Sequence, residues 1–464
     1  MLNLKSGAKA KDVALACGAQ IVYEGIKDTF DAVIDSRAAK DGVIFVAIKG
    51  ERTNGHLYTA SAAENGASAV LVEEDVPSLE PFIKNNCSVL KVDSTPKALA
   101  LLSKAHKAEM KAMTVGVTGS VGKTTTRQYI ASVLSTKYNT HKTEGNFNNE
   151  LGLPLTLLSL TPDDEASVIE MGMGQRGDIS FLSQLSMPDI AVITTIGSSH
   201  IEHLGSREAI AEAKLEVLDG LKEGGKLILN GDEVLLSGIK NAIYVSLHNE
   251  NSHYRATNIK YSVKGMTFDA LCPQRKISGC LIPTLGDHTV LDAMYAVAVG
   301  DILGLNDYEI KRGLNEFKGV GMRQNIVQKD GITYIHDYYN ASPESIKASL
   351  KVTKNLAKDV SGRAVGVIGS VLELGKLSET LHRSIGSFIA ENGIDLLFTF
   401  GEDASFIADE AIKNGFDANK VQVFKDITDP KPISKAINYE KKSGDCILIK
   451  ASHGIEMGRI AELI

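Results

Sequence analysis

At the centre of the sequence stands Val117-Thr118-Gly119-Ser120-Val121-Gly122-Lys123-Thr124-Thr125-Thr126, which follows an apolar run over 113–117 and precedes a helical pattern. A glycine-rich turn between a strand and a helix is typical of a loop that cradles phosphate groups. Its glycines let backbone N–H groups point at phosphate oxygens, Lys123 supplies a mobile charge, and Thr124 offers a hydroxyl to Mg2+. The stretch therefore predicts a nucleoside triphosphate site within an α/β fold.

This loop departs from the usual spacing at one position. The pattern G-x-x-x-x-G-K-[ST] places a glycine where Val117 stands, and the nearest glycine is Gly116. We interpret the loop as a variant whose nucleotide-binding residues are Gly119, Ser120, Gly122, Lys123, Thr124 and Thr125. A turn of this kind also occurs without any ligand, but Gly-Lys-Thr at its end is hard to explain in that way.

Length and composition restrict the class of protein. The chain has 464 residues, of which 43% are hydrophobic and 23% are charged, and these are ordinary values for a globular protein. Because single cores rarely grow beyond about 250–300 residues, we expect several domains. The net charge is −7, and long runs of lysine and arginine are missing, so we expect small-molecule partners and no nucleic acid.

Cysteine usage and hydropathy indicate a cytoplasmic protein. The five cysteines are scattered and form no C-x-x-C pair, which argues against a disulfide framework and against a zinc site. The N-terminus has no apolar signal segment, and no run reaches the roughly 18 apolar residues that a membrane span needs. We therefore expect neither export nor membrane insertion, and we expect a monomer.

The order of strand-like and helix-like segments predicts three domains. Residues 1–107 mix short strand patterns with helices, as in a small α/β domain. From Met113 the alternation becomes regular, which predicts a central phosphate-loop domain with a mainly parallel sheet over 108–320. The pattern restarts near Gly319-Val320-Gly321, so residues 321–464 are expected to form a second doubly wound, Rossmann-like unit.

Two strand ends in the central domain carry candidate metal ligands. Glu170 ends an apolar strand over 166–170, so its carboxylate is expected at the sheet edge where open α/β sheets bind ligands. His200 follows a strand over 190–196, and we prefer it to His203 because it lies closer to the strand end. Both residue types are common at such places without any metal, and it is the phosphate loop that favours a metal site.

Lys214 and the amide-rich loop over 143–154 are ambiguous when judged from their residues alone. Lys214 lies on a predicted helix over 207–221, where the default expectation is a solvated charge. The loop contains Asn146 and Asn149, whose side chains suit either a polar substrate or ordinary turn formation.

In order and spacing, five segments closely resemble the ATP-dependent Mur ligases of peptidoglycan synthesis. They are the phosphate loop, Glu170-Met171-Gly172, Ile196-Gly197-Ser198-Ser199-His200, Ala213-Lys214-Leu215-Glu216 and Asn230-Gly231-Asp232. Segments 143–154, 337–343, 372–375 and 449–452 are similar to the members that add D-alanyl-D-alanine to a UDP-N-acetylmuramoyl-tripeptide. The resemblance runs through all three domains, and it implies a ligase for cell wall biogenesis, on which cell shape and division depend.

This resemblance implies roles for the central-domain candidates. Lys123 and Thr124 would hold the β- and γ-phosphates of ATP with one Mg2+, and Glu170 and His200 would bind a second Mg2+. Lys214 would be carbamylated and would help to hold that second ion. The implied reaction transfers the γ-phosphoryl group to the peptide carboxylate, and the amine of D-alanyl-D-alanine then attacks the acyl phosphate, which gives an amide, ADP and phosphate.

Further substrate contacts are implied in the two outer domains. Ser36 and Arg37 match the uridine-nucleotide end of the N-terminal domain, which is then expected to bind the UDP part of the substrate. Arg323 and Asp337 match positions that contact ATP from the C-terminal domain after domain closure. The residues expected near the peptide substrates are Asn146, Asn149 and Asn340.

Four positions depart from the family pattern. Thr289 and Asp292 stand where asparagines usually meet the adenine, which leaves the adenine contacts open. Tyr338 replaces the usual serine, and His453 stands where an arginine is common.

Three alternatives remain beside this interpretation. Another amide ligase of the superfamily, such as the preceding Mur enzyme or a folylpolyglutamate synthase, is disfavoured because an Asn-Pro-Arg motif is missing and residues 35–56 resemble the uridine-nucleotide site. A phosphate-loop switch or motor is disfavoured because the sequence has no Asn-Lys-x-Asp guanine motif. A nucleotide-binding homologue without ligase activity is suggested only by Thr289 and Asp292. The third residue of the acceptor peptide, lysine or a diaminopimelate, stays open.

Overall fold

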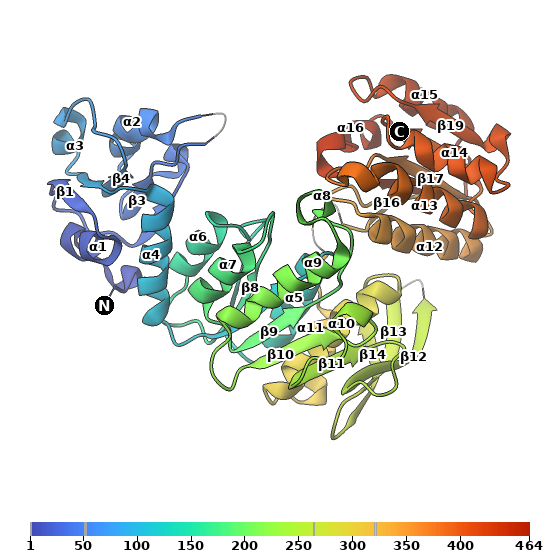
Figure 1. Cartoon of the computed structure of the whole chain (residues 1–464), viewed down its shortest axis with the longest axis horizontal. Helices are drawn as coiled ribbons and strands as arrows, with labels where there is room; N and C mark the ends of the chain where they lie inside the picture. The colour runs from blue at the N-terminus through green and yellow to red at the C-terminus, as the bar shows by residue number, and fades with distance from the viewer. Residues whose placement is uncertain (1, 51–52, 263–264, 320, 322) are drawn as a thin grey trace.

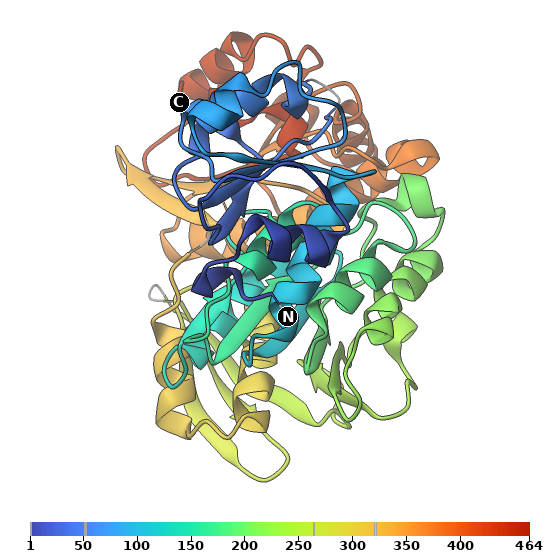
Figure 2. The same cartoon turned by 90° about the vertical axis from the view of Figure 1, so that its left-hand side faces the viewer.

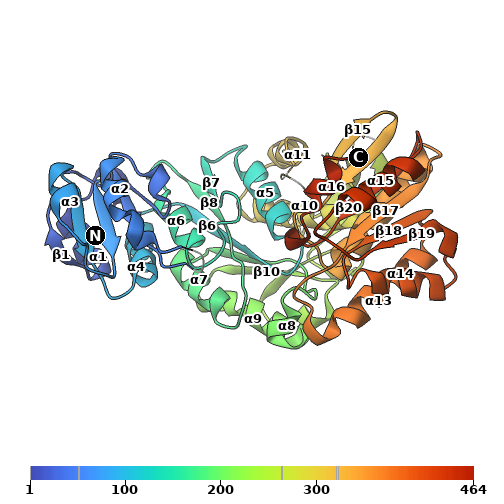
Figure 3. The same cartoon turned by 90° about the horizontal axis from the view of Figure 1, so that it is seen from above.

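Three β-sheets, one for each predicted domain, organise the fold (Figure 1). The computed structural model describes residues 2–50, 53–262, 265–319, 321 and 323–464. The N-terminal and C-terminal sheets lie on opposite sides of the central sheet in two perpendicular views (Figures 1 and 3). The predicted end of the central domain, Val320, falls outside the described residues. Across the described ranges, no helix combines the length and the apolar character that crossing a membrane requires.

The N-terminal sheet has the strand order β1-β5-β4-β3-β2, in which β1 is antiparallel to β5 and the other pairs are parallel. Every residue of β3 and β4 is buried, as expected of strands that are covered on both faces. The domain faces the viewer in Figure 2. Its elements are α1 (Ala10–Cys17), β1 (Gln20–Tyr23), β2 (Asp31–Val33), β3 (Val43–Val46), α2 (Thr59–Glu64), β4 (Ala69–Val72), α3 (Glu80–Lys84), β5 (Ser88–Lys91) and α4 (Thr95–Ala108).

The central sheet has the order β14-β13-β12-β11-β10-β9-β6-β8-β7, parallel from β7 to β12 and antiparallel at β12–β13 and β13–β14. The expectation of a mainly parallel sheet is therefore confirmed. Its strands are β6 (Met113–Thr118), β7 (Thr140–Lys142), β8 (Ala166–Glu170), β9 (Ile190–Ile193), β10 (Lys226–Asn230), β11 (Ala242–Ser246), β12 (Tyr254–Ser262), β13 (Gly265–Leu271) and β14 (Lys276–Ile282).

Helices cover both faces of this sheet. α5 and α10 pack on one face, where α10 is buried at every position from Thr289 to Gly300, as its almost uniformly apolar sequence requires. Residues of α6, α7 and α9 form the core on the other face. The helices of the domain are α5 (Lys123–Leu134), α6 (Gly152–Leu158), α7 (Asp178–Ser186), α8 (Ile201–Leu204), α9 (Arg207–Leu215), α10 (Asp287–Ile302) and α11 (Asp307–Asn315).

The C-terminal sheet has the order β15-β16-β20-β17-β18-β19, and its pairs are parallel except for β15–β16. This is the predicted Rossmann-like unit. Its elements are β15 (Asn325–Lys329), β16 (Ile332–His336), α12 (Pro343–Asp359), β17 (Ala364–Gly369), α13 (Ser378–Glu391), β18 (Leu396–Phe400), α14 (Ser405–Lys413), β19 (Val421–Phe424), α15 (Lys431–Glu440), β20 (Cys446–Lys450) and α16 (Gly458–Ala461).

The two domain junctions have different packing. The N-terminal domain joins the central one through α4, which packs against α6 and α7, and Leu158 of α6 belongs to the N-terminal core. The C-terminal domain meets the central one where Ile201 of α8 shares a buried apolar cluster with Val371 and Leu374. The helix expected over 207–221 is shorter than predicted: α9 ends at Leu215 and continues as a 3-10 turn, η4 (Glu216–Asp219).

Candidate active site

The phosphate loop is shaped by two glycines that other residues cannot replace. Gly119 has φ 147°, and a Cβ atom there would collide with Oγ1 of Thr194. Gly122 has φ 89°, ends the loop as the N-cap of α5, and lies against the carboxyl group of Asp292. The backbone N–H of Ser120 donates to the carbonyl of Thr195 at 2.7 Å, which fixes the loop to the segment after β9. Loop and sheet are therefore held in one register.

Polar groups inside this loop suit a phosphate ligand. The ammonium of Lys123 donates to the carbonyls of Gly119 at 2.7 Å and Ser120 at 3.3 Å. Burial lowers the pKa of Lys123, while the nearby Glu170 acts in the opposite direction. The hydroxyl oxygen of Ser120 is buried and, among the described residues, has no hydrogen-bond partner. A phosphate oxygen would satisfy such a group.

Glu170 ends β8, and the register of β6 with β8 sets it opposite Val117, next to the phosphate loop. Its Oε1 accepts from the Thr124 hydroxyl at 3.2 Å and from the Asn148 amide at 2.9 Å. Its Oε2 accepts from Nη1 of Arg127 at 2.9 Å, in an ion pair whose side chains are only 3–4% exposed. Arg127 also donates to the carbonyl of Gly145 at 3.2 Å. The structure thus ties Glu170 to both the phosphate loop and the amide-rich loop.

A cavity of about 1130 Å3, called the second cavity below, gathers most of the predicted catalytic residues. The predicted residues that line it are Lys123, Thr124, Asn146, Asn149, Glu170, His200, Lys214, Arg323 and Asn340. Lys214 is 2% exposed, so the expectation of a solvated charge is wrong: α9 turns this side chain into the protein. Burial, followed by the charge of Lys123, lowers the pKa of Lys214 well below its usual value, which favours the neutral amine.

His200 connects the central and C-terminal domains at this cavity. It adopts φ 63° at the start of α8, and its Nδ1 lies 2.7 Å from Oε2 of Glu373, which itself has φ 62°. Burial lowers the pKa of His200, so the neutral form that can ligate a metal is favoured. A second link joins the hydroxyl of Ser198 to Oε1 of Glu344 at 2.7 Å. His203 lines the same cavity, so the preference for His200 stays a prediction.

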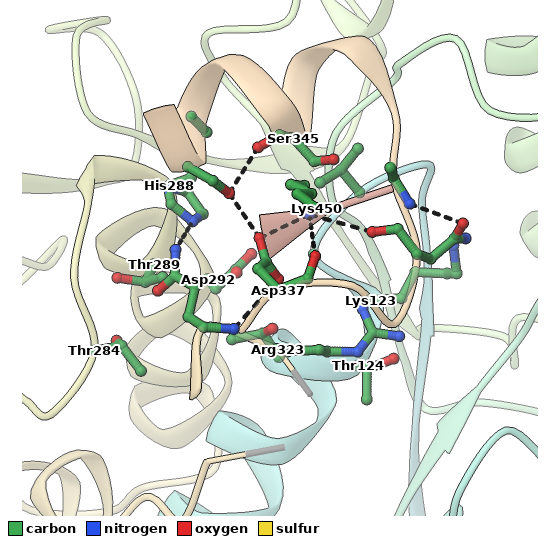
Figure 4. Close-up of a pocket in the computed structure, with 18 of the residues that line it drawn as sticks. Lys123, Thr124, Thr284, His288, Thr289, Asp292, Arg323, Asp337, Ser345 and Lys450 are labelled. Atoms are coloured by element: carbon green, nitrogen blue, oxygen red, sulfur yellow. Dashed lines mark hydrogen bonds and ion pairs between the residues drawn. The ribbon is translucent and has the colours of Figure 1, made fainter. Parts of the chain in front are cut away.

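A cavity of about 580 Å3, called the first cavity, lies between the phosphate loop, α10 and the C-terminal domain (Figure 4). Its predicted nucleotide contacts are Ser120, Gly122, Lys123, Thr124, Thr125, Arg323 and Asp337. Asp337 accepts from Lys450 at 2.7 Å, from the Ser349 hydroxyl at 2.6 Å and from the backbone N–H of Gln324 at 3.2 Å. The side chain of Gln324 meets Nε2 of His288 at 2.8 Å, across the domain junction.

Two of the four positions that depart from the family pattern, Thr289 and Asp292, line the first cavity. The Thr289 hydroxyl donates to the carbonyl of Gly286 at 2.8 Å. Asp292 is 6% exposed and accepts from the Thr126 hydroxyl at 3.0 Å. Burial raises the pKa of Asp292 to about 8. The protonated form is therefore favoured at neutral pH, and in this form the side chain can both donate and accept hydrogen bonds, as an asparagine side chain does.

Some predicted residues lie elsewhere or have a structural task. Ser36 and Arg37 form a turn, η2 (Ser36–Ala38), in the N-terminal domain, where Arg37 pairs with Asp35 at 2.7 Å, and neither lines the two cavities. The carbonyl of Gly119 accepts a hydrogen bond from the ammonium of Lys123. Asn149 lines the second cavity and also accepts from the N–H of Gly152 at 2.9 Å, which stabilises the start of α6.

Sequence reasoning missed several residues of the site, notably Arg127 and Lys450. Arg127 lies four residues after Lys123, on the same face of α5, and this spacing was a signal that could have revealed it. Lys450 and Glu373 lie in segments that were noted only for their resemblance, because no local pattern shows that a strand end will meet a cavity.

Two side chains beside the phosphate loop offer oxygen donors that would suit Mg2+. Among the described residues, no three His, Cys, Asp or Glu side chains gather into a ready metal site. The hydroxyl of Thr124 and the carboxylate of Glu170 are the hard oxygen donors that Mg2+ prefers, and both line the second cavity.

These features define a class: a phosphate-loop enzyme in which a Rossmann-like domain meets the loop across a cavity. Models of three domains match the chain, namely the Mur ligase family catalytic domain at 32–107, the Mur ligase middle domain at 117–300 and the Mur ligase glutamate ligase domain at 322–453. The chain belongs to the Mur ligase family.

Individual relatives agree over nearly the whole chain. The UDP-N-acetylmuramoyl-tripeptide--D-alanyl-D-alanine ligase of Bacillus subtilis (strain 168) is 41% identical over 92% of this chain and 91% of its own length. That of Escherichia coli (strain K12) is 32% identical over 83% and 84%. The solved structure of MurF from Acinetobacter baumannii superposes with a TM-score of 0.88, at 28% identity and 98% coverage of both chains. The MurF ligase of Thermotoga maritima, solved in complex with ADP, gives 0.78, at 28% identity and 93% and 96% coverage.

Replacement of Asp292 by asparagine tests the buried acid. In the unfolded chain the acid titrates near pH 4, whereas in the folded protein it titrates near 8, so stability falls as the pH rises between these values, by about 1.4 kcal/mol per pH unit at most. We expect the melting temperature of Asp292→Asn to rise relative to the unmodified protein from pH 5.5 to pH 8. The exposed Asp219→Asn should show no such trend. A difference in melting temperature between Asp292→Asn and the unmodified protein that stays constant from pH 5.5 to pH 8 would contradict the assignment.

Proposed function

We propose that this chain is an ATP-dependent ligase that joins D-alanyl-D-alanine to UDP-N-acetylmuramoyl-tripeptide and forms ADP and phosphate. The supporting observation is the 41% identity with the Bacillus subtilis ligase across 92% of the chain, together with a phosphate loop that opens on two cavities at a domain junction. The ADP complex of the Thermotoga maritima relative supports ATP as the nucleotide. The product would serve peptidoglycan synthesis, and thereby cell shape and division.

The first cavity is the proposed site of the triphosphate. Its phosphates would meet the backbone of the phosphate loop, the ammonium of Lys123 and the N-terminus of α5. A triphosphate and a carboxylate repel each other, so positive charge has to compensate before phosphoryl transfer. Lys123 and Arg323 line both cavities and would supply such charge to each of them. Bound Mg2+ would add charge at Thr124 and Glu170.

The second cavity is the proposed site of the tripeptide carboxylate, beside the amide-rich loop. The carboxylate oxygen takes the γ-phosphoryl group from ATP, and ADP leaves. The amine of the dipeptide then attacks the acyl carbon and forms the amide bond. The bond between this carbon and the phosphorylated oxygen breaks, phosphate leaves together with that oxygen, and the amine loses a proton. A third cavity of about 300 Å3 adjoins the second, shares Asn146, His200 and Asn340 with it, and is the proposed dipeptide site.

Two Mg2+ ions and a carbamylated Lys214 complete the proposed site. A neutral buried amine is the form that adds CO2, and the lowered pKa of Lys214 favours that form. The carbamate would give the Lys214 side chain a negative charge, which the neutral amine lacks and which an Mg2+ ligand at this place would need. Together with Glu170 and the carbamate, the neutral ring of His200 would bind the second Mg2+.

The remaining features of the proposal concern the whole molecule. We place the UDP end of the substrate near Ser36 and Arg37, and the domain boundaries near 107 and 320. We further propose a cytoplasmic monomer that acts on small molecules and does not bind nucleic acid.

The function is tested by phosphate release from purified protein. We expect release only when ATP, UDP-N-acetylmuramoyl-tripeptide and D-alanyl-D-alanine are all present, with tripeptides ending in lysine or diaminopimelate compared in parallel. Single amino acids should not replace the dipeptide. Steady ATP hydrolysis without peptide substrates would instead indicate a nucleotide-driven switch, and nucleotide binding without any release would indicate an inactive homologue.

Loss of the phosphate-loop charge should abolish turnover. Lys123→Ala removes the ammonium that faces the phosphates, and we expect kcat to fall by about 100-fold or more. The exposed Lys420→Ala is the matched control and should keep the full rate. A Lys123→Ala enzyme with a near-normal rate would refute the proposed phosphate site.

Carbamylation of Lys214 should make activity depend on bicarbonate. We expect 13C-labelled bicarbonate to give a carbamate signal in NMR spectra that disappears in Lys214→Ala, even without substrates. The Lys214→Ala enzyme should be inactive and should regain part of its rate with a short carboxylate such as formate. Absence of both the signal and the rescue would count against the modification.

A further inference from the structure

A buried lysine that the proposed chemistry leaves unused lies at the end of β20. The side chain of Lys450 is 3% exposed and lines the first cavity. In the C-terminal sheet β20 is the neighbour of β16, and the register pairs His336 with Ile449. Lys450 is therefore set beside Asp337, the first residue after β16, and Figure 4 shows their side chains together.

All three protons of this ammonium are directed at one loop, residues 337–342, which connects β16 to α12. Lys450 donates to Oδ2 of Asp337 at 2.7 Å, to the carbonyl of Asp337 at 3.2 Å and to the carbonyl of Asn340 at 3.2 Å. A lysine has three donors, so these bonds use its full capacity. The ammonium thus fixes the loop at two points, three residues apart.

These two points carry contacts that face different cavities. Asp337 lines the first cavity, where the nucleotide is proposed, whereas Asn340 lines the first, second and third cavities. Asp337 also accepts from the N–H of Gln324, so the same ammonium steadies the segment that carries Arg323. Arg323 lies over the ring of Tyr339 at 4.5 Å, within the same loop.

We propose that Lys450 is a positioning residue that presents Asp337 to the nucleotide and Asn340 to the incoming dipeptide at the same time. This inference rests on the proposed function. Removal of the ammonium leaves the largely buried Asp337 carboxylate without its cation and frees the Asn340 carbonyl, so both contacts lose their position together. A residue that touched only the nucleotide would affect ATP alone.

The chain offers a matched control at the opposite end of β20. Arg363 pairs with the buried Asp445 at 2.7 Å, immediately before Cys446, and the two residues line neither the first nor the second cavity. Arg363→Met therefore breaks an ion pair of the same sheet, whose carboxylate is buried and whose guanidinium is partly exposed, without touching the site. It should lower the melting temperature and leave all Michaelis constants unchanged.

The experiment compares Lys450→Met, Lys450→Arg and Arg363→Met in the phosphate-release assay, with melting temperatures measured in parallel. For Lys450→Met we expect KM for ATP and KM for D-alanyl-D-alanine each to rise by about tenfold or more, the scale of a lost charge-assisted hydrogen bond. KM for UDP-N-acetylmuramoyl-tripeptide should rise less than either of these, because Asn340 is only one of the residues that line the second cavity and the UDP end is proposed to bind in the N-terminal domain. Lys450→Arg keeps the charge but not the three-point geometry, so it should shift the same two constants with a smaller loss of stability.

Other outcomes overturn the proposal in distinguishable ways. A rise confined to KM for ATP would make Lys450 a direct nucleotide contact, and unchanged constants in both Lys450 variants would remove any role. If Lys450→Met does not fold, Lys450→Arg decides alone. An unmodified protein without dipeptide-dependent release refutes the proposed ligase, and calorimetric titration with a non-hydrolysable ATP analogue then still tests the Asp337 contact: equal affinities in the Lys450 variants would overturn it.

Discussion

The ion pair between Arg127 and Glu170 brings together the parts of the site that come from different segments of the chain. Arg127 lies on the helix that begins at the phosphate loop, Glu170 ends the neighbouring strand, and Gly145 belongs to the amide-rich loop. Both charged groups are removed from water, so each needs the other as a partner. A shift of either segment would leave a buried charge unpaired. The position of Thr124 relative to Glu170, on which metal binding would depend, is a consequence of this pair.

Charge burial of the same kind recurs at the carboxyl edge of the C-terminal sheet. There, Lys450 and Asp337 occupy adjacent strand ends and face the first cavity, which the phosphate loop borders from the other side. Between the two edges stands the contact of His200 with Glu373, two residues with left-handed backbone conformations. Such conformations are unfavourable for side chains with a Cβ and persist only where surrounding contacts hold them, which suits residues that must point across a domain junction.

The sequence was sufficient for the three-part α/β architecture, because short apolar strand patterns alternate regularly with helical patterns in the central and C-terminal parts of the chain. It was also sufficient to place Lys123, Thr124 and Glu170 near one another, since consecutive strand ends of a parallel sheet share an edge. Short elements such as β7 and α6 gave too few residues for a periodic signal. Burial of Lys214, the Arg127 pair and the Lys450 contacts depends on which helix face meets which sheet edge, and a single sequence does not contain that information.

The junction formed by α4 has a mechanical consequence for the substrates. Fourteen residues of helix, about 21 Å long, connect the N-terminal core to the central domain, and Leu158 of α6 is buried in that N-terminal core. α6 begins where Asn149 stabilises its first turn. Any tilt of the N-terminal domain relative to the central domain would therefore move α6 and displace the loop that carries Asn146 and Asn149. If the N-terminal domain binds the UDP end of the proposed substrate, that binding would change the position of the amide-rich loop at the peptide end before phosphoryl transfer begins.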